Sequence, residues 1–204
     1  MTKLAFVLSN DPGRKKCQTS RLTNAGPIYG YDAVFRDTKT DAIVLTNYTI
    51  AKDAFEAQVQ EHAHVYTFDS IWVTYGRPER ARAYPAVDYI DSPDTWLPEA
   101  LAAQLACTEQ ADVVVLVGFD FYSTSPQDNL YAGMYKLLGQ EYTVLQRNNL
   151  ISQLHAVIAN NPSTSFVFIH DEVEPPAELD DLDNWTADTY ANLYSFVDGF
   201  SADS

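Results

Sequence analysis

The sequence predicts an α/β fold, a single Rossmann-like domain in which helices cover both faces of a mostly parallel sheet. Short, uniformly apolar runs alternate with segments of helical spacing along the chain. That alternation is typical of parallel strands buried on both faces. The chain has 204 residues, 46% of them hydrophobic, which is enough for one domain with a sizeable core. It shows neither internal repeats nor low-complexity segments.

The apolar runs and the helical spacings locate the expected elements in order. Strands are predicted at residues 3–10, 41–47, 64–69, 112–118 and 166–170, with a further short strand at 31–37. Helices are predicted at residues 48–63, 95–110 and 148–161, and a terminal helix at 185–197. Residues 11–30 contain two Pro and three Gly and are expected to form a long loop with room for one helical turn. No element is predicted for the aromatic, proline-broken stretch 70–94, and residues 171–184 are expected to be irregular.

Charge divides the chain unevenly. Residues 171–204 contain ten acidic residues and neither Lys nor Arg, so they contribute −10 of the net charge of −15. We therefore expect a Rossmann-like domain at residues 1–170 and an acidic C-terminal extension, ending in a helix, at 171–204. The net charge argues against binding to nucleic acid or to anionic membranes, because both require a positive surface. An acidic composition is also compatible with a salt-adapted or viral origin.

The sequence shows no sign of a membrane span or of a signal peptide, which bears on the cellular compartment. No apolar run approaches the roughly 18 residues of a membrane span, and the apolar part of the first segment is short for a signal peptide. A cytoplasmic protein is expected. Cys17 and Cys107 fit that compartment as free thiols, with a single disulfide as the alternative.

Four of the 13 basic side chains lie close together in the first loop, namely Arg14, Lys15, Lys16 and Arg21. The loop lacks the spacing of a Walker loop and of the dinucleotide fingerprint. Its Pro12–Gly13 turn nevertheless exposes backbone N–H groups beside cations, which is an arrangement that can hold a phosphate. A solvated basic loop is the other interpretation of the same residues, and charge alone does not separate the two.

The carboxyl ends of the predicted strands carry small or polar residues. In parallel α/β sheets ligands bind at this edge, so these residues are the predicted site. They are Ser9, Asn10, Thr46, Asn47, residues 118–122, His170 and Asp171.

His170 differs from the other three histidines because it ends a buried strand beside an acidic pair. It could serve as a general base or as a metal ligand, or it could be a hydrogen-bonded structural residue. The chain has no Cys cluster, H-E-x-x-H or EF-hand pattern, so no metal site and no cofactor are predicted. A metal-dependent phosphohydrolase built on Asp120, His170 and Asp171 is a more distant alternative.

Four segments together resemble one family. "VLSNDPG", "DAVFRD", "DAIVLTN" and above all "ADVVVLVGFDFY" are similar, in order and approximate spacing, to the bacterial lipooligosaccharide sialyltransferases. The resemblance covers residues 3–60 and 99–135 and continues more weakly to about 170. The G-F-D-F-Y element is its most specific part.

The resemblance implies a Rossmann-like domain that binds a CMP-activated sugar and transfers it with inversion, without a metal. Asn10 would approach the nucleotide's phosphate or ribose, and Asn47 would contact the nucleotide or sugar. Tyr122 and Tyr131 would stabilise the departing phosphate. Residues of the same nucleotide site would include Gly13, Gly118 and Asp120.

The chain departs from that family's pattern where the general base is expected. Gln146 and Arg147 stand in place of the family's His, and neither side chain accepts a proton from a sugar hydroxyl. His170 would then have to act as the base from another strand end. Two hypotheses follow: a glycosyltransferase that uses a nucleotide sugar and a glycan acceptor, or a catalytically inactive fold that serves as a binding or structural module, for instance as a homo-oligomer.

Overall fold

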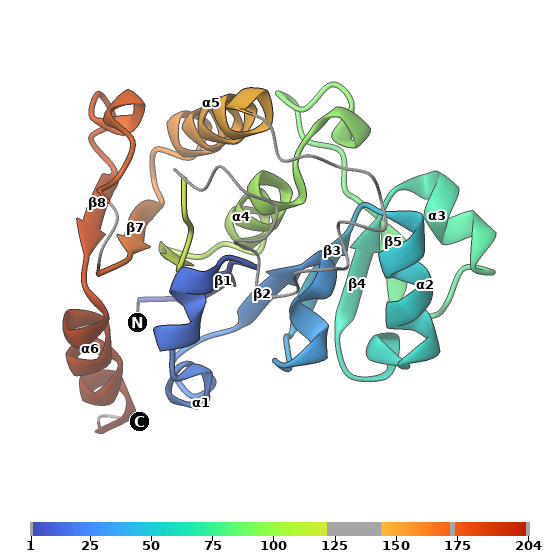
Figure 1. Ribbon diagram of the computed structural model, residues 1–204, viewed down its shortest axis with the longest axis horizontal. Coiled ribbons are helices and arrows are strands. Elements are labelled where there is room, and N and C mark those ends of the chain that lie inside the picture. Colours follow the sequence, from blue (N-terminus) through green and yellow to red (C-terminus); the bar gives the residue numbers. More distant parts are fainter. Residues whose placement is uncertain (1, 122–143, 172–173, 203–204) are drawn as a thin grey trace.

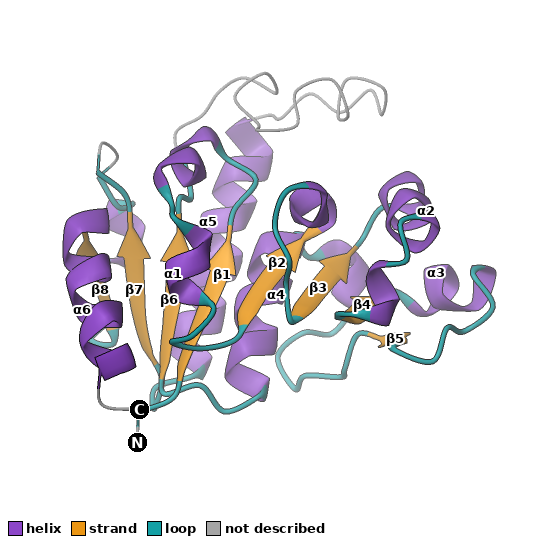
Figure 2. Cartoon of the chain, turned by 90° about the horizontal axis from the view of Figure 1, so that it is seen from below, coloured by secondary structure: helices purple, strands orange, loops and turns teal. Residues whose placement is uncertain are grey.

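The computed structural model describes residues 2–121, 144–171 and 174–202 of the chain. Its centre is one sheet of eight strands in the order β5-β4-β3-β2-β1-β6-β7-β8, and every neighbouring pair runs parallel (Figure 2). The strands are β1 Leu4–Leu8, β2 Ile28–Tyr31, β3 Ala42–Leu45, β4 His64–Thr67, β5 Ala81–Ala83, β6 Val113–Val117, β7 Ser165–Ile169 and β8 Trp185–Asp188. The predicted α/β fold with a parallel sheet is confirmed.

Helices cover both faces of the sheet (Figure 1). The α-helices are α1 Thr19–Leu22, α2 Tyr48–Glu56, α3 Asp69–Thr74, α4 Pro98–Thr108, α5 Val144–Asn160 and α6 Tyr190–Ala202. Short 3-10 helices are η1 Pro12–Lys16, η2 Asp32–Arg36, η3 Val59–Glu61, η4 Pro93–Thr95 and η7 Ala177–Leu179. In the described part of the chain, no helix combines the length and the apolar character needed to span a membrane.

Alternate residues of the strands pack into different cores, as the two-residue period of a strand requires. In β1, Ala5 and Val7 face a cluster that includes α4 and α5, whereas Phe6 and Leu8 face a cluster that includes α1 and α6. A third cluster joins β3 and β4 to α2 and α3. Because both faces are covered, all five residues of β1 are buried, which explains the uniformly apolar runs in the sequence.

The second strand lies earlier than predicted. Residues 28–31 form β2 in a stretch expected to be a loop, and the predicted strand at 31–37 is wrong because η2 occupies that position. The change of structure coincides with Asp32, whose φ of 43° lies in the left-handed region. A non-glycine residue in that region ends an extended strand.

Two further strands come from segments where none was predicted. β5 lies in the aromatic middle stretch, and β8 occupies the start of the predicted terminal helix, which therefore begins only at Tyr190. β8 pairs in parallel with β7, so part of the acidic C-terminal segment belongs to the sheet. α6 then packs on the core through Tyr190, Leu193 and Val197. Cys17 and Cys107 are free thiols, as expected.

Candidate functional site

The switch point of the sheet lies between β1 and β6. α1, which follows β1 in the chain, packs on one face of the sheet. α5, which connects β6 to β7, packs on the opposite face (Figure 1). Connections that leave adjacent strands toward opposite faces open a crevice at the carboxyl ends, where ligands bind in such folds. The predicted strand-exit residues after β1 and β6 therefore border this crevice.

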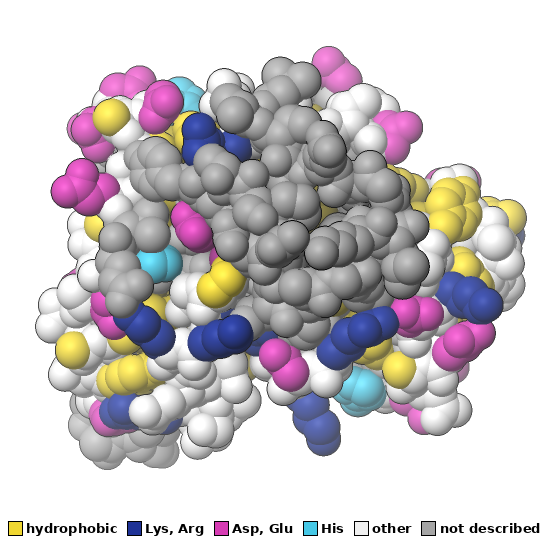
Figure 3. Space-filling model, viewed as in Figure 1, with side chains coloured by type: hydrophobic (Ala, Val, Ile, Leu, Met, Phe, Trp, Pro, Cys, Tyr) yellow, Lys and Arg dark blue, Asp and Glu magenta, His cyan; other side chains and the backbone are white. Residues whose placement is uncertain are grey.

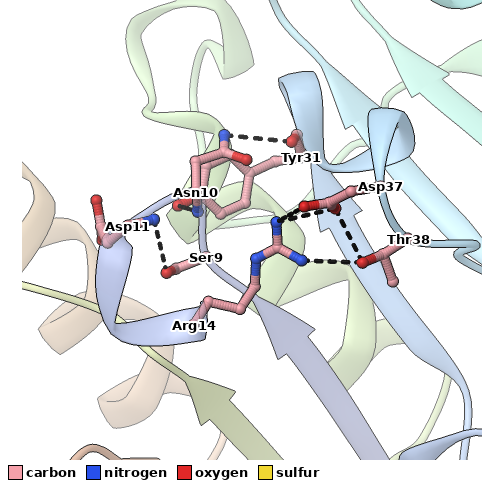
Figure 4. Close-up of polar contacts among 7 residues, drawn as sticks. All are labelled: Ser9, Asn10, Asp11, Arg14, Tyr31, Asp37 and Thr38. Carbon is pink, nitrogen blue, oxygen red and sulfur yellow. Dashed lines mark hydrogen bonds and ion pairs between the residues drawn. The ribbon is translucent and has the colours of Figure 1, made fainter. Parts of the chain in front are cut away.

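Hydrogen bonds tie the first loop to the exit of β6. The Ser9 hydroxyl donates to the carbonyl oxygen of Gly118 over 2.6 Å. It also accepts from the backbone N–H of Asp11 over 3.0 Å (Figure 4). The backbone N–H of Asp120 donates to Oδ2 of Asp11 over 3.0 Å. The loops after β1 and β6 thus form one connected unit.

Asn10 is held against β2. Its backbone N–H donates to the hydroxyl of Tyr31 over 3.0 Å, and its Nδ2 donates to the carbonyl oxygen of Tyr31 over 3.4 Å (Figure 4). Both residues are buried. The predicted role of Asn10 in binding a nucleotide stays a prediction, and these contacts show what positions its side chain.

A second carboxylate occupies the exit of β2. Asp32 is buried, and its Oδ1 accepts a hydrogen bond from the backbone N–H of Thr46, which follows β3, over 3.3 Å. Asp11 at β1 and Asp32 at β2 therefore each accept a backbone N–H from the exit of another strand. Neither residue is among the predicted site residues, although both follow strands and the strand-exit rule applies to them.

Glu99 in the first turn of α4 completes a group of carboxyls. Its Oε2 is buried and has no hydrogen-bond partner within residues 2–121, 144–171 and 174–202. Burial, and after it the charges of Asp32 and Asp11, raise the pKa of Glu99 to about 8. Nothing in the sequence pointed to Glu99, because its place in the site depends on how α4 lies across the sheet.

The cations of the first loop contact carboxylates of this chain. Nη2 of Arg14 lies 3.0 Å from both carboxylate oxygens of Asp37, and Nη1 lies 2.9 Å from the Thr38 hydroxyl (Figure 4). Lys16 lies 3.9 Å from Asp171, and Arg21 pairs with Asp198. Lys15 is exposed. Figure 3 shows both basic and acidic side chains around the part of this face that is drawn in grey. The ion pairs named above balance three of the loop's four cations with acids.

His170 lies against the first loop. A Cβ built on Gly13 would be 2.3 Å from Nε2 of His170, so the histidine ring occupies the space beside that glycine. The ring also stacks on Phe168, with centroids 6.1 Å apart and an interplanar angle of 18°. The hydroxyl of Tyr190 in α6 donates to the Gly13 carbonyl oxygen over 3.0 Å. Residues from β7 and from the C-terminal helix thereby reach the loop after β1.

The structure brings together five of the eight predicted site residues, from the exits of β1, β6 and β7: Asn10, Gly13, Gly118, Asp120 and His170. Asn47, at the exit of β3, caps α2, since its Oδ1 accepts from the N–H groups of Thr49 and Ile50 over 2.9 and 3.3 Å. Tyr122 and Tyr131 lie outside the described residues.

The described residues do not form a metal site. No group of three or more His, Cys, Asp or Glu side chains there is placed to hold a metal ion. Of the residues considered for a phosphohydrolase, Asp171 directs its carboxylate to Lys16 and to the backbone N–H of Tyr190, the latter over 3.1 Å.

Replacing Asp11 with asparagine is expected to flatten the pH dependence of stability. Burial raises the pKa of Asp11 to about 7, with a further contribution from the Asp120 carboxylate, against the opposing effects of the Asp120 N–H, Ser9 and Arg14. A carboxyl whose pKa is higher in the folded state binds its proton more tightly there. Its contribution to stability is therefore fully present below the unfolded pKa of about 4 and is lost as the pH rises to about 7.

Urea unfolding of both proteins between about pH 5 and pH 8 measures this effect. Asparagine keeps an oxygen that accepts the Asp120 N–H but does not ionise. The wild type should lose more unfolding free energy than the Asp11→Asn variant across this range, with Glu99 leaving some pH dependence in both. Parallel curves for the two proteins would contradict the raised pKa of Asp11.

Comparison with known proteins gives no match in sequence and a clear match in structure. No protein-family model and no curated protein matches the chain. The α-2,3-sialyltransferase Cst-I from Campylobacter jejuni superposes with a TM-score of 0.60 at 12% identity, covering 99% of this chain and 94% of that one. CstII from the same organism, in complex with the substrate analogue CMP-3FNeuAc, gives 0.57 at 15% identity over 82% and 81% of the two chains.

The chain has a sialyltransferase-like fold. A further structure with this fold, CST-II in complex with a trisaccharide acceptor and CMP, gives a TM-score of 0.55 at 12% identity over 81% of this chain and 80% of that chain. The resemblance inferred from the four sequence segments is thereby confirmed at the level of the fold. Within the sialyltransferase-like fold of this chain, those segments supply β1 with its loop, η2, β3 and the exit of β6.

Proposed function

We propose that this chain is a glycosyltransferase-like protein that binds a nucleotide sugar, with a CMP-sugar favoured, at the carboxyl ends of β1, β6 and β7. The observation that carries the proposal is the convergence of three loops at the switch point of a sialyltransferase-like fold. Two solved structures of CstII, which has this fold, are complexes with CMP and with the substrate analogue CMP-3FNeuAc. A glycan acceptor fits the same proposal, because one of those complexes holds a trisaccharide acceptor.

The proposed reaction is an inverting transfer that needs no metal. A hydroxyl oxygen of the acceptor bonds to the anomeric carbon of the donor sugar, while the bond from that carbon to the phosphate oxygen of CMP breaks. His170 accepts the hydroxyl proton, and Tyr122 and Tyr131 donate hydrogen bonds to the departing phosphate. Asn10 approaches the phosphate or ribose of the nucleotide, and Asn47 contacts the nucleotide or the sugar.

Gly13 and Gly118 are proposed to let the protein backbone lie close to the ligand, and Asp120 belongs to the same part of the site. Gly13 lies in the Pro12–Gly13 turn next to His170. Gly118 lies between the first loop and β7 and has a φ of +73°. Glycine permits both close approaches because it has no Cβ. The half-buried His170 ring lies over this turn, so a phosphate bound there would be adjacent to the proposed base.

A second candidate function is a binding module that holds the nucleotide or sugar without turnover. The observation that favours it is the pair Gln146 and Arg147 in place of the family's histidine. General acid–base help contributes roughly 100- to 10,000-fold, so its loss would leave a protein that binds its ligand with negligible turnover. This candidate predicts the same ligand selectivity and differs only in catalysis.

Thermal unfolding with a panel of nucleotides tests the proposal. CMP, CDP, UDP, GDP and their sugar conjugates are compared first without metal and then with magnesium. Ligand at a hundred times its Kd adds about 2.7 kcal/mol, which for a chain of this size raises Tm by roughly 5–10 °C. We expect a selective shift with CMP and its conjugates that is the same with and without magnesium.

The Asn10→Ala and Tyr122→Phe variants serve as the matched tests of the site. Both should lose part of the CMP-induced shift. A panel in which no nucleotide changes Tm would overturn the proposed function, and a CMP shift that survives in both variants would move the site elsewhere on the molecule.

A further inference from the structure

Oε2 of Glu99 is a hydrogen-bond acceptor with no donor in the part of the chain that the structure describes. This oxygen is buried. A buried acceptor without a partner costs about 1–3 kcal/mol, and buried polar atoms in folded proteins nearly always have partners. The partner for this oxygen therefore lies outside the described residues, and a bound ligand is the candidate.

Glu99 lies at the switch point of the sheet, so a group that pairs with its Oε2 would bind there. α4 packs on β1, β2 and β3, and Glu99 lies in its first turn, which stands over the carboxyl ends of those parallel strands. Asp11 and Asp32 follow β1 and β2 at the same edge, and their charges act on Glu99. The unused acceptor thus belongs to the crevice where the nucleotide sugar is proposed to bind.

The charges near Glu99 limit which chemical groups could pair with its Oε2. Asp11 and Asp32 each use one oxygen to accept a backbone N–H group, and their charges already disfavour a negative charge on Glu99. A second anionic group, such as the carboxylate of an acidic sugar, would be repelled here. A nitrogen donor is favoured, because N–H groups carry positive partial or full charge. Even when Glu99 holds its proton, its carbonyl oxygen remains an acceptor.

We propose that Oε2 of Glu99 accepts a hydrogen bond from an amino group of the bound ligand. This inference rests on the proposed nucleotide-sugar function. The amino group is then either the exocyclic amine of cytosine or an amino substituent of the transferred sugar. Both sources offer the same N–H donor to the same oxygen, and neither adds negative charge. Glu99 is thereby a specificity-determining residue of the site.

The test compares ligand pairs that differ in one amino group. CMP against UMP isolates the cytosine amine, and UDP-glucosamine against UDP-glucose isolates the sugar amine. Free glucosamine against free glucose forms a third pair that reports on the amino group even if no nucleotide binds. Wild-type protein should bind the amino member of at least one pair about tenfold more tightly by calorimetry, since one buried hydrogen bond is worth about 1.4 kcal/mol.

Glu99→Met removes the acceptor while keeping the volume of the side chain. The variant should bind both members of the selective pair equally and, without ligand, should melt at a higher temperature than the wild type. The reason is that methionine leaves no buried oxygen unpaired. A residue that only stabilised the fold would show the opposite change in Tm.

Glu109 after the other end of α4 is the matched control. Its two carboxylate oxygens accept from the hydroxyls of Tyr29 and Tyr66 over 3.3 and 2.9 Å, so Glu109→Met should lower Tm and leave ligand selectivity unchanged.

Two outcomes overturn the inference. Equal affinities within all three pairs on the wild type would do so, as would selectivity that persists in Glu99→Met. A panel that is flat for nucleotides together with a preference for glucosamine over glucose would instead reject the nucleotide and retain the amine at Glu99.

Discussion

Replacing Gly118 with alanine is expected to destabilise the fold by about 3 kcal/mol, or roughly 6–12 °C in Tm. Gly118 has a φ of +73°, and a Cβ there would be 2.4 Å from the backbone nitrogen of Arg14 and 2.6 Å from its Cα. The left-handed conformation costs roughly 1–2 kcal/mol for a residue with a Cβ. The clash adds to that cost because backbone atoms cannot move aside as the end of a side chain can. Urea and thermal unfolding measure both effects.

Gly76→Ala is the control that separates strain from clash. Gly76 has nearly the same φ, +75°, but a Cβ there would have no heavy atom within 4 Å. Its substitution should cost only the conformational part, about 1 kcal/mol. If Gly118→Ala cost no more than Gly76→Ala, the close approach between the first loop and the exit of β6 would be wrong.

Replacing His170 with asparagine is expected to lower the rate of sugar transfer by 100- to 10,000-fold, the range associated with loss of a general base. Asparagine has similar size at the first atoms of the side chain and cannot take up the acceptor's proton. Affinity for CMP should change little, because the proposed role of His170 lies in the transfer step. The measurements are initial rates with a CMP-sugar donor and calorimetric titration with CMP.

His155→Asn is the matched histidine control. His155 lies on α5, is partly exposed, and contacts the exposed carboxylate of Asp181 over 3.2 Å, so its loss should leave the rate unchanged. Equal rates for His170→Asn and the wild type would mean that another group is the base. A wild type that binds CMP and transfers no sugar would favour the binding module instead.

Most of the parallel sheet was predictable because burial on both faces leaves a direct trace in the sequence. The runs at β1, β3, β6 and β7 are apolar at nearly every position, and β4 is buried at its last three positions. Each of these strands was found close to its observed bounds. β5 and β8 are edge strands with few buried residues, so their sequences lack that trace. β2 is buried but contains a glycine and lies in a Pro- and Gly-containing stretch, which favoured a loop.

The site was predictable only where a residue follows its strand directly. Asn10, Gly118 and His170 met that rule, and the structure places them at adjoining exits. Asp32 was missed because β2 was placed too late in the chain. Glu99 belongs to a helix, so its approach to Asp11 and Asp32 depends on how α4 packs across the sheet, a contact between positions far apart in sequence.

The sequence by itself determined the fold class and the edge of the sheet at which ligands would bind, because hydrophobic period and strand polarity are local properties of the chain. The tertiary structure alone decided which charges meet there. It directed Arg14 to Asp37 and brought Asp11, Asp32 and Glu99 to the same crevice. The electrostatic character of a site depends on distances between residues that are remote in sequence, and only packing sets those distances.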